Sequence, residues 1–165
     1  MFCNIIITKT KFASDLILKN TNLHSMYIPD PIRYTKIEPK KNINSDLRLL
    51  WFGTSANHDS IPIALNSINK INVDVQIDIV TKIENDLIVS IRPIKLFDKI
   101  KLYNFSEKTL VSKANEADII FIPYLTDQAR LVKSSNRIID SINFGRFVVM
   151  SDVSQFKEFS KYTFQ

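Results

Sequence analysis

The segment from Lys133 to Asp140 carries side chains suited to binding an anion. Lys133 and Arg137 are cations, and Ser134 and Asn136 are neutral hydrogen-bond donors between them. The apolar residues that follow predict a helix beginning near Ser134, and a helix N-terminus presents unpaired N–H groups and a partial positive charge. The segment is therefore predicted to bind a diphosphate, although a simple capping role for Ser134 with solvated cations stays open.

Further candidate binding residues are Asp140, which lies one turn along that helix, and Gly53, which follows an earlier apolar run. Asp140 is placed to accept hydrogen bonds from ribose hydroxyls, as acids near phosphate-binding turns do in doubly wound folds. Gly53 would let backbone amides approach a ligand, with Thr54, Ser55 and Asn57 lining the same crevice. A glycine needed only for a tight turn is an equally good interpretation.

Two other polar residues have weaker claims. His58 sits in the loop after Gly53 and could act as a general base, although a lone histidine in a polar loop is more often exposed and inert. Asp152 follows an apolar run and could face the crevice, although acids at strand ends commonly cap the next helix. Neither residue is predicted as part of the site.

Composition excludes several classes of protein. The only cysteine is Cys3 and the only histidines are His24 and His58, so no disulfide framework, no metal site and no cofactor are predicted. No apolar run approaches the ~18 residues needed to span a bilayer. The net charge of +5 is spread along the chain, which favours a small anionic ligand or an acidic membrane surface over nucleic acid.

The elements that must position these residues alternate between strands and helices. Short apolar or alternating runs predict strands over 47–52, 73–80, 87–91, 100–105, 118–122 and 147–150. Helical periodicity and capping residues predict helices over 61–71, 106–117, 134–144 and 154–162. We predict an α/β fold with a doubly wound, Rossmann-like parallel sheet, in which the strand at 118–122 is central because its run is almost entirely apolar.

The first 46 residues follow another pattern. They predict a strand over 4–8, a short helix over 13–19, a second strand over 26–28 and a polar linker over 36–46. We therefore divide the chain into a remnant of a preceding domain with a linker, 1–46, and a single main domain, 47–165. An orphan strand edge at 4–8 could pair with another chain, which is compatible with a homo-oligomer.

The order of these pieces resembles the C-terminal, donor-binding half of GT-B-type glycosyltransferases. The resemblance rests on four segments: residues 6–8, 13–16 and 27–32; residues 49–53; residues 115–123; and residues 133–152, which are the most specific. The chain departs from the family at two places. The first acid of the family's paired-carboxylate motif would fall near Val132 or Lys133, and the basic residues usual after the first glycine are missing from 53–60.

The resemblance implies a metal-independent glycosyltransferase that takes a UDP- or GDP-sugar donor and a glycan or lipid-linked acceptor. This chain would supply the donor-binding half, with the diphosphate held by Lys133, Ser134 and Asn136. The acceptor site and the catalytic base would come from a preceding domain, so we expect little sugar transfer by this chain alone. The expected location is cytoplasmic, compatible with peripheral association at the inner membrane face. The alternative is a non-catalytic nucleotide-binding or interaction module.

Overall fold

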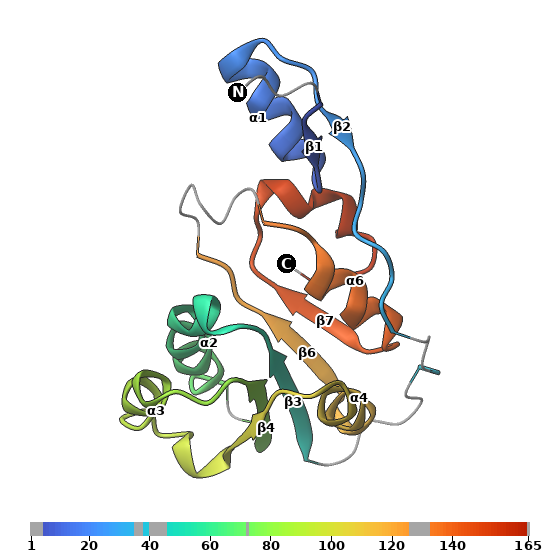
Figure 1. The fold of residues 1–165 in the computed structure, drawn as a ribbon. Coiled ribbons are helices and arrows are strands. Elements are labelled where there is room, and N and C mark those ends of the chain that lie inside the picture. Colours follow the sequence, from blue (N-terminus) through green and yellow to red (C-terminus); the bar gives the residue numbers. More distant parts are fainter. Residues whose placement is uncertain (1–4, 35–37, 40–45, 72, 126–132, 165) are drawn as a thin grey trace.

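The computed structural model describes residues 5–34, 38–39, 46–71, 73–125 and 133–164. Within them, a five-stranded parallel sheet has the order β5-β4-β3-β6-β7 (Figure 1). Its strands are β3 (Leu47–Phe52), β4 (Val75–Thr81), β5 (Ile100–Asn104), β6 (Ile119–Ile122) and β7 (Phe147–Met150). The predicted Rossmann-like α/β fold is confirmed. The strand at 118–122 is interior, hydrogen-bonded to β3 on one side and β7 on the other.

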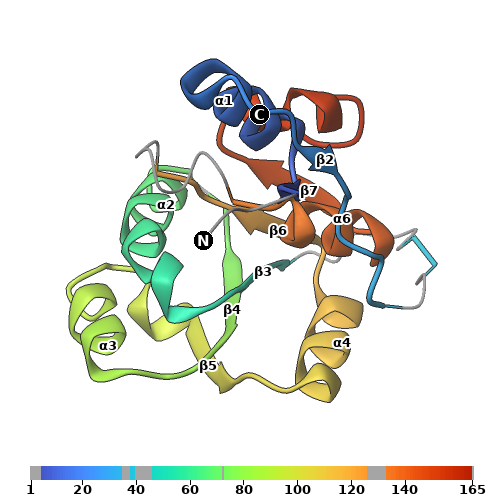
Figure 2. The same cartoon turned by 45° about the horizontal axis from the view of Figure 1, so that its top comes forward.

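Helices cover both faces of this sheet, as Figure 2 shows. Helices α2 (Ile61–Ile68) and α3 (Asn85–Ile91) lie on one face, and α4 (Glu107–Glu116) and α6 (Asn136–Asn143) lie on the other. Short 3-10 helices η1 (Ser55–Ser60), η2 (Phe97–Lys99) and η3 (Ser154–Phe159) complete the described main domain. No helix among the described residues is long and apolar enough to cross a membrane.

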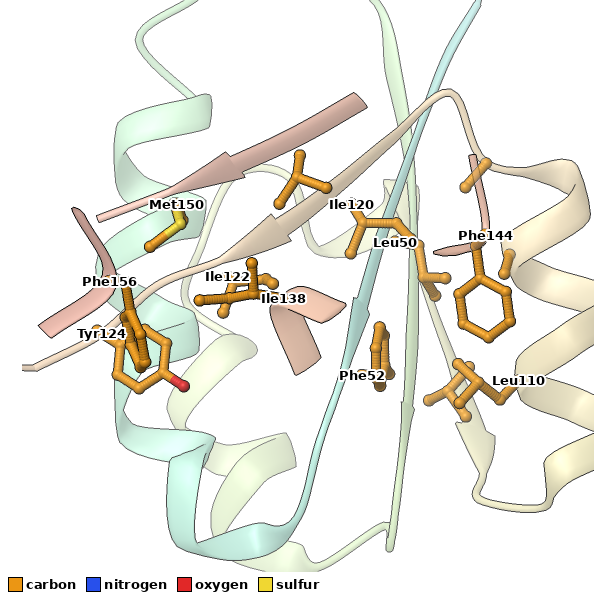
Figure 3. Packing of buried hydrophobic residues seen from close by; sticks show 14 of the residues in the cluster. Leu50, Phe52, Leu110, Ile120, Ile122, Tyr124, Ile138, Phe144, Met150 and Phe156 are labelled. Atoms are coloured by element: carbon orange, nitrogen blue, oxygen red, sulfur yellow. The ribbon is translucent and has the colours of Figure 1, made fainter. Parts of the chain in front are cut away.

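Alternation along β3 divides the core into two layers. Leu50 and Phe52 pack with the residues of α4 and α6, whereas Leu49 and Trp51 pack with those of α2 and α3. Successive side chains of a strand point to opposite faces, so a strand covered on both faces needs an unbroken apolar run. Figure 3 shows the first layer, where Phe144, the residue that follows α6, lies close to Phe52 and packs edge to face against it.

Two helix ends behave as the sequence predicts. The Ser106 side chain accepts a hydrogen bond from the backbone N–H of Thr109 at 3.0 Å and so caps α4. Gly145 follows the end of α6 with φ of 63°, a left-handed conformation that glycine adopts without steric cost. Ser106 thus fixes where α4 begins, and Gly145 fixes where α6 ends.

The prediction of a strand over 87–91 is wrong, because these residues form α3. The run of β-branched residues favours a strand locally, but Leu87 and Ile91 lie on one helix face and are buried, while Val89 is 71% exposed. The C-terminal segment predicted as an amphipathic helix is a 3-10 helix that ends at Phe159.

A small unit precedes the main sheet. Strand β1 (Ile7–Thr8) pairs in parallel with β2 (Met26–Tyr27), and α1 (Lys11–Thr21) connects them. Figure 1 places this unit beside the C-terminal segment and above β7. The predicted strand, helix and strand are confirmed in kind, whereas most of the predicted linker lies outside the described residues. The domain division at residue 46 stays a prediction.

Candidate functional site

A pocket of about 640 Å³ opens at the carboxyl ends of β3, β4, β5 and β6. The chain runs from β3 outward to β4 and β5, then crosses back to place β6 on the other side of β3. Ligands of open α/β sheets bind at such a switch point. The lining residues are Arg33, Tyr34, Phe52, Gly53, Thr54, Ser55, Ala56, Asn57, Lys82, Phe105, Leu110, Tyr124, Lys133, Ser134, Asn136 and Arg137.

Gly53 forms the corner between β3 and this pocket. Its N–H donates to the Val80 carbonyl at 3.2 Å, and its carbonyl accepts from the Thr81 hydroxyl at 2.8 Å. A Cβ at this position would lie 2.9 Å from Cη2 of Trp51 and 3.3 Å from Nη1 of Arg137. A side chain at this position would therefore have to push the Trp51 ring and the Arg137 guanidinium aside.

Arg137 is held between aromatic rings at the base of the pocket. Its guanidinium carbon lies 5.0 Å from the Tyr124 ring centroid and 5.8 Å from that of Trp51. Cations are attracted to ring faces at such distances. Nη1 of Arg137 is buried and makes no hydrogen bond to the described residues. A cation in this setting has unused capacity to bind an anion.

The two segments predicted to share a ligand do meet. Nζ of Lys133 donates to Oδ1 of Asn57 at 2.9 Å, which joins the loop after β3 to the start of α6. Lys82 follows β4 and adds another cation to the lining. Its side chain is 79% exposed, and its Nζ lies 3.2 Å from Oε1 of Glu84. The pocket wall is therefore strongly basic.

The N-terminus of α6 has an acidic neighbour that sequence reasoning missed. Burial acts to raise the pKa of the Asp30 carboxyl. Hydrogen bonding with Lys9 and Ser134, the charge of Lys9 and hydrogen bonding with Asn136 act against burial and outweigh it, so the pKa lies below its usual value. Oδ1 of Asp30 lies 2.8 Å from Nζ of Lys9. An anionic carboxylate thus lies close to the helix N-terminus, beside two residues predicted to hold the diphosphate.

Arg33 and Tyr34 reach the same pocket from the N-terminal segment. The Arg33 guanidinium forms an ion pair with Asp140, and the Tyr34 ring packs on Phe144 with centroids 5.1 Å apart. The Asp140 side chain is only 2% exposed and does not line the pocket, unlike the other predicted site residues. Its predicted contact with ribose therefore has no direct path in this conformation.

His58 is buried, not exposed in a polar loop. Its Nε2 donates to the Thr81 hydroxyl at 2.8 Å, since that hydroxyl gives its own proton to the Gly53 carbonyl. Burial lowers the pKa of His58, although Glu84 and Asp59 act in the opposite direction. The histidine thus supports the Gly53 corner from behind and does not line the pocket.

Two further observations bear on cofactors and on Asp152. In the described part of the chain, no group of three or more His, Cys, Asp or Glu side chains could hold a metal ion. Asp152 is exposed and is not part of the lining. The lining residues missed by the sequence analysis include Lys82, Phe105 and Tyr124, which all follow strands and could have been found from that position.

Comparison with known proteins gives matches in structure alone. The chain matches no sequence family and no curated protein. A glycosyltransferase from Rickettsia africae ESF-5 matches 97% of this chain and 48% of its own length, with a TM-score of 0.68 and 13% identity. A mutant of S. aureus TarM, solved with UDP, matches 94% of this chain and 31% of its own, with a TM-score of 0.67 and 14% identity.

A third structure agrees with these two. The lipopolysaccharide outer core galactosyltransferase WaaB matches 91% of this chain and 43% of its own, with a TM-score of 0.63 and 9% identity. This chain thus spans less than half the length of each of these three proteins. The resemblance to this group, predicted from the sequence, is confirmed at the level of the fold. The chain has the Rossmann-like fold of one half of a GT-B-type glycosyltransferase.

Proposed function

We propose that the pocket binds the diphosphate of a nucleotide sugar and that the chain is the donor-binding half of a glycosyltransferase. The observation that carries the proposal is the gathering of Arg33, Lys82, Lys133 and Arg137 around a pocket at the switch point of the sheet. These side chains come from three separate segments, around residue 33, after β4 and at the start of α6, so their convergence is a property of the fold. A single basic stretch of sequence would not produce it.

The arrangement suits both binding and departure of a diphosphate. When the sugar–phosphate bond breaks, negative charge grows on the diphosphate oxygen that leaves. Fixed cations aimed at that charge stabilise the transition state, with Arg137 and Lys133 in the role that a divalent metal has elsewhere. Phe105 and Leu110 give the pocket an apolar wall that fits a nucleoside base.

Sugar transfer also needs an acceptor and a base to deprotonate it. No carboxylate or imidazole is found among the described lining residues. We therefore place the acceptor site and the catalytic base outside the described part of this chain, in a second domain or a partner. The same observation favours the second candidate function, a nucleotide-binding module without catalysis, and a transfer assay separates the two.

Titration calorimetry with UDP, GDP and ADP tests the binding proposal. We expect one of them to bind, and Lys133→Ala and Arg137→Gln to weaken it by about 1–3 kcal/mol each, since each removes a charge-assisted contact. Lys70→Ala and Arg92→Ala are matched controls, because both residues are exposed and outside the pocket. A parent protein that binds none of the nucleotides contradicts the proposal.

A transfer assay tests the division of labour. The chain is incubated with the nucleotide sugar that corresponds to the bound nucleotide and with a panel of glycan and lipid-linked acceptors. We expect donor binding with little or no transfer, because an acceptor that is not positioned forgoes the gain from proximity, up to ~7–11 kcal/mol. Robust transfer by this chain alone would show that the base and the acceptor site lie within it.

A further inference from the structure

Asp140 and Arg33 form a contact between distant parts of the chain. Asp140 lies inside α6, where its side chain is only 2% exposed, whereas the Arg33 side chain is 48% exposed. The Arg33 guanidinium donates to Oδ2 of Asp140. A buried carboxylate without a partner is strongly unfavourable, so Asp140 requires this cation in the folded state.

The two residues differ in their relation to the pocket. Arg33 lines it and Asp140 does not. Burial raises the pKa of Asp140, while the hydrogen bond and the charge of Arg33 act against that rise. The carboxylate therefore lies behind the guanidinium as seen from the pocket, and a ligand would meet Arg33 first.

Further contacts fasten the backbone next to Arg33. The Asn143 side-chain amide donates to the Tyr34 carbonyl, and the Tyr34 ring packs on Phe144. The Arg33 guanidinium carbon also lies 5.7 Å from the Tyr34 ring centroid. The guanidinium is thus held by a carboxylate and by an aromatic ring that is itself fixed on α6.

We propose that Asp140 is a positioning residue, which holds Arg33 at the pocket wall so that Arg33 contacts the anionic group of the ligand. This inference rests on the proposed function. It assigns Asp140 a different task from the contact with ribose hydroxyls predicted from the sequence. It also makes the N-terminal segment part of the donor site, because Arg33 comes from that segment.

Calorimetry on Asp140→Asn, Arg33→Gln and the double variant tests the assignment. We expect each single variant to raise the dissociation constant of the nucleoside diphosphate on the order of tenfold. The double variant should bind no worse than Arg33→Gln, because Asp140 acts only through Arg33. Arg92→Gln is the matched control, since Arg92 is exposed and outside the pocket.

The 2′,3′-dideoxy form of the same nucleoside diphosphate lacks the ribose hydroxyls. The ratio of the affinities for the two forms therefore reports a direct contact with those hydroxyls and is not changed by a general loss of structure. We expect Asp140→Asn to weaken both forms by the same factor, so that their affinity ratio stays at the parent value. An Asp140 in contact with ribose would instead make this ratio collapse toward one and would add a further loss in the Arg33→Gln background. Either outcome overturns the proposal.

A measurement without ligand separates this inference from the proposed function. Amide hydrogen exchange at residues 32–34 should be faster in Asp140→Asn than in the parent, and equally fast in the double variant, which leaves no charged carboxylate buried without its cation. If no nucleotide binds but exchange rises, the proposed function fails and the positioning contact stands. If exchange in both variants equals that of the parent, Asp140 does not hold Arg33 and the inference is wrong.

Discussion

The main sheet and the N-terminal unit use the same strand, helix and strand motif but differ in how well it is covered. In the main domain, Leu50 and Trp51 of β3 are fully buried between two layers of helices. In the N-terminal unit, α1 has no buried residue at all. Because parallel strands are normally covered on both faces, the first arrangement is complete and the second is not.

One face of the two strands of the N-terminal unit exposes large apolar side chains. Ile7 and Met26 are direct neighbours in the β1–β2 register, and their side chains are 61% and 55% exposed. Thr8, on the opposite face of β1, is buried. In this unit the polar residue is buried and the large apolar residues face solvent. The surface of a folded domain normally shows the opposite arrangement.

The comparison also explains the candidate site. Most of the pocket wall comes from the ends of main-sheet strands, while Arg33 and Tyr34 come from the segment that follows the N-terminal unit. Within the main domain, Lys133 is held by a hydrogen bond and Arg137 by two aromatic rings. The segment needs explicit fastening to α6, which Asp140 and Asn143 provide.

The largest expected effect is on the stability of the main sheet. Leu50→Ala should lower the free energy of unfolding by about 2–5 kcal/mol, because it opens a cavity in the core. Leu18→Ala in α1 should cost less than about 1 kcal/mol, because this side chain is already 39% exposed. Chemical denaturation measures both, and similar losses would contradict the difference between the two regions.

Substitution of the two glycines should separate an effect on the binding site from an effect on the fold alone. Gly53→Ala should destabilise the fold by about 1–3 kcal/mol, because its Cβ would press on the buried Trp51 ring. It should also weaken nucleotide binding, because Arg137 must move. Gly145→Ala should cost about 1–2 kcal/mol through its positive φ and leave binding unchanged. Unfolding curves and calorimetry on both variants decide this, and unaltered binding by Gly53→Ala would be inconsistent with the site.

The N-terminal unit should make the protein self-associate through its apolar face. Ile7→Lys should shift the protein toward monomer, because the charge would be desolvated in any contact on that face. Ile63→Lys is the matched control, since Ile63 is 56% exposed on α2 of the main domain. Sedimentation velocity over a range of concentrations measures the effect, and a parent that is monomeric throughout would contradict the prediction.

Much of the main fold could be predicted because its strands are buried on both faces and therefore read as apolar runs. The run at 87–91 misled because short β-branched segments do not distinguish strand from helix, and the packing of Leu87 and Ile91 decides. Loop residues such as Gly53 and Lys133 could be predicted because they adjoin strands and helix starts. Arg33 could not, because its contact with Asp140 joins residues 107 positions apart and has no local signal.

The smallest expected effect is a pH dependence of stability that comes from His58. Its pKa is lowered in the folded protein by burial, against the opposing charges of Glu84 and Asp59. The unfolded chain, with a histidine pKa of about 6.5, therefore takes up the proton first as the pH falls. Stability that is present above about pH 6.5 is lost as the pH drops toward the folded pKa.

His58→Gln removes this titration, so the unfolding temperature of the parent should fall relative to this variant between about pH 7.5 and pH 5. His24→Gln is the matched control, because it removes the other histidine of the chain, which is exposed in the N-terminal unit. The effect belongs to the main domain, where the His58 imidazole is packed against Thr81 and couples its proton to folding. Parallel pH profiles for the parent and His58→Gln would show that the buried imidazole is protonated as readily in the folded protein as in the unfolded chain.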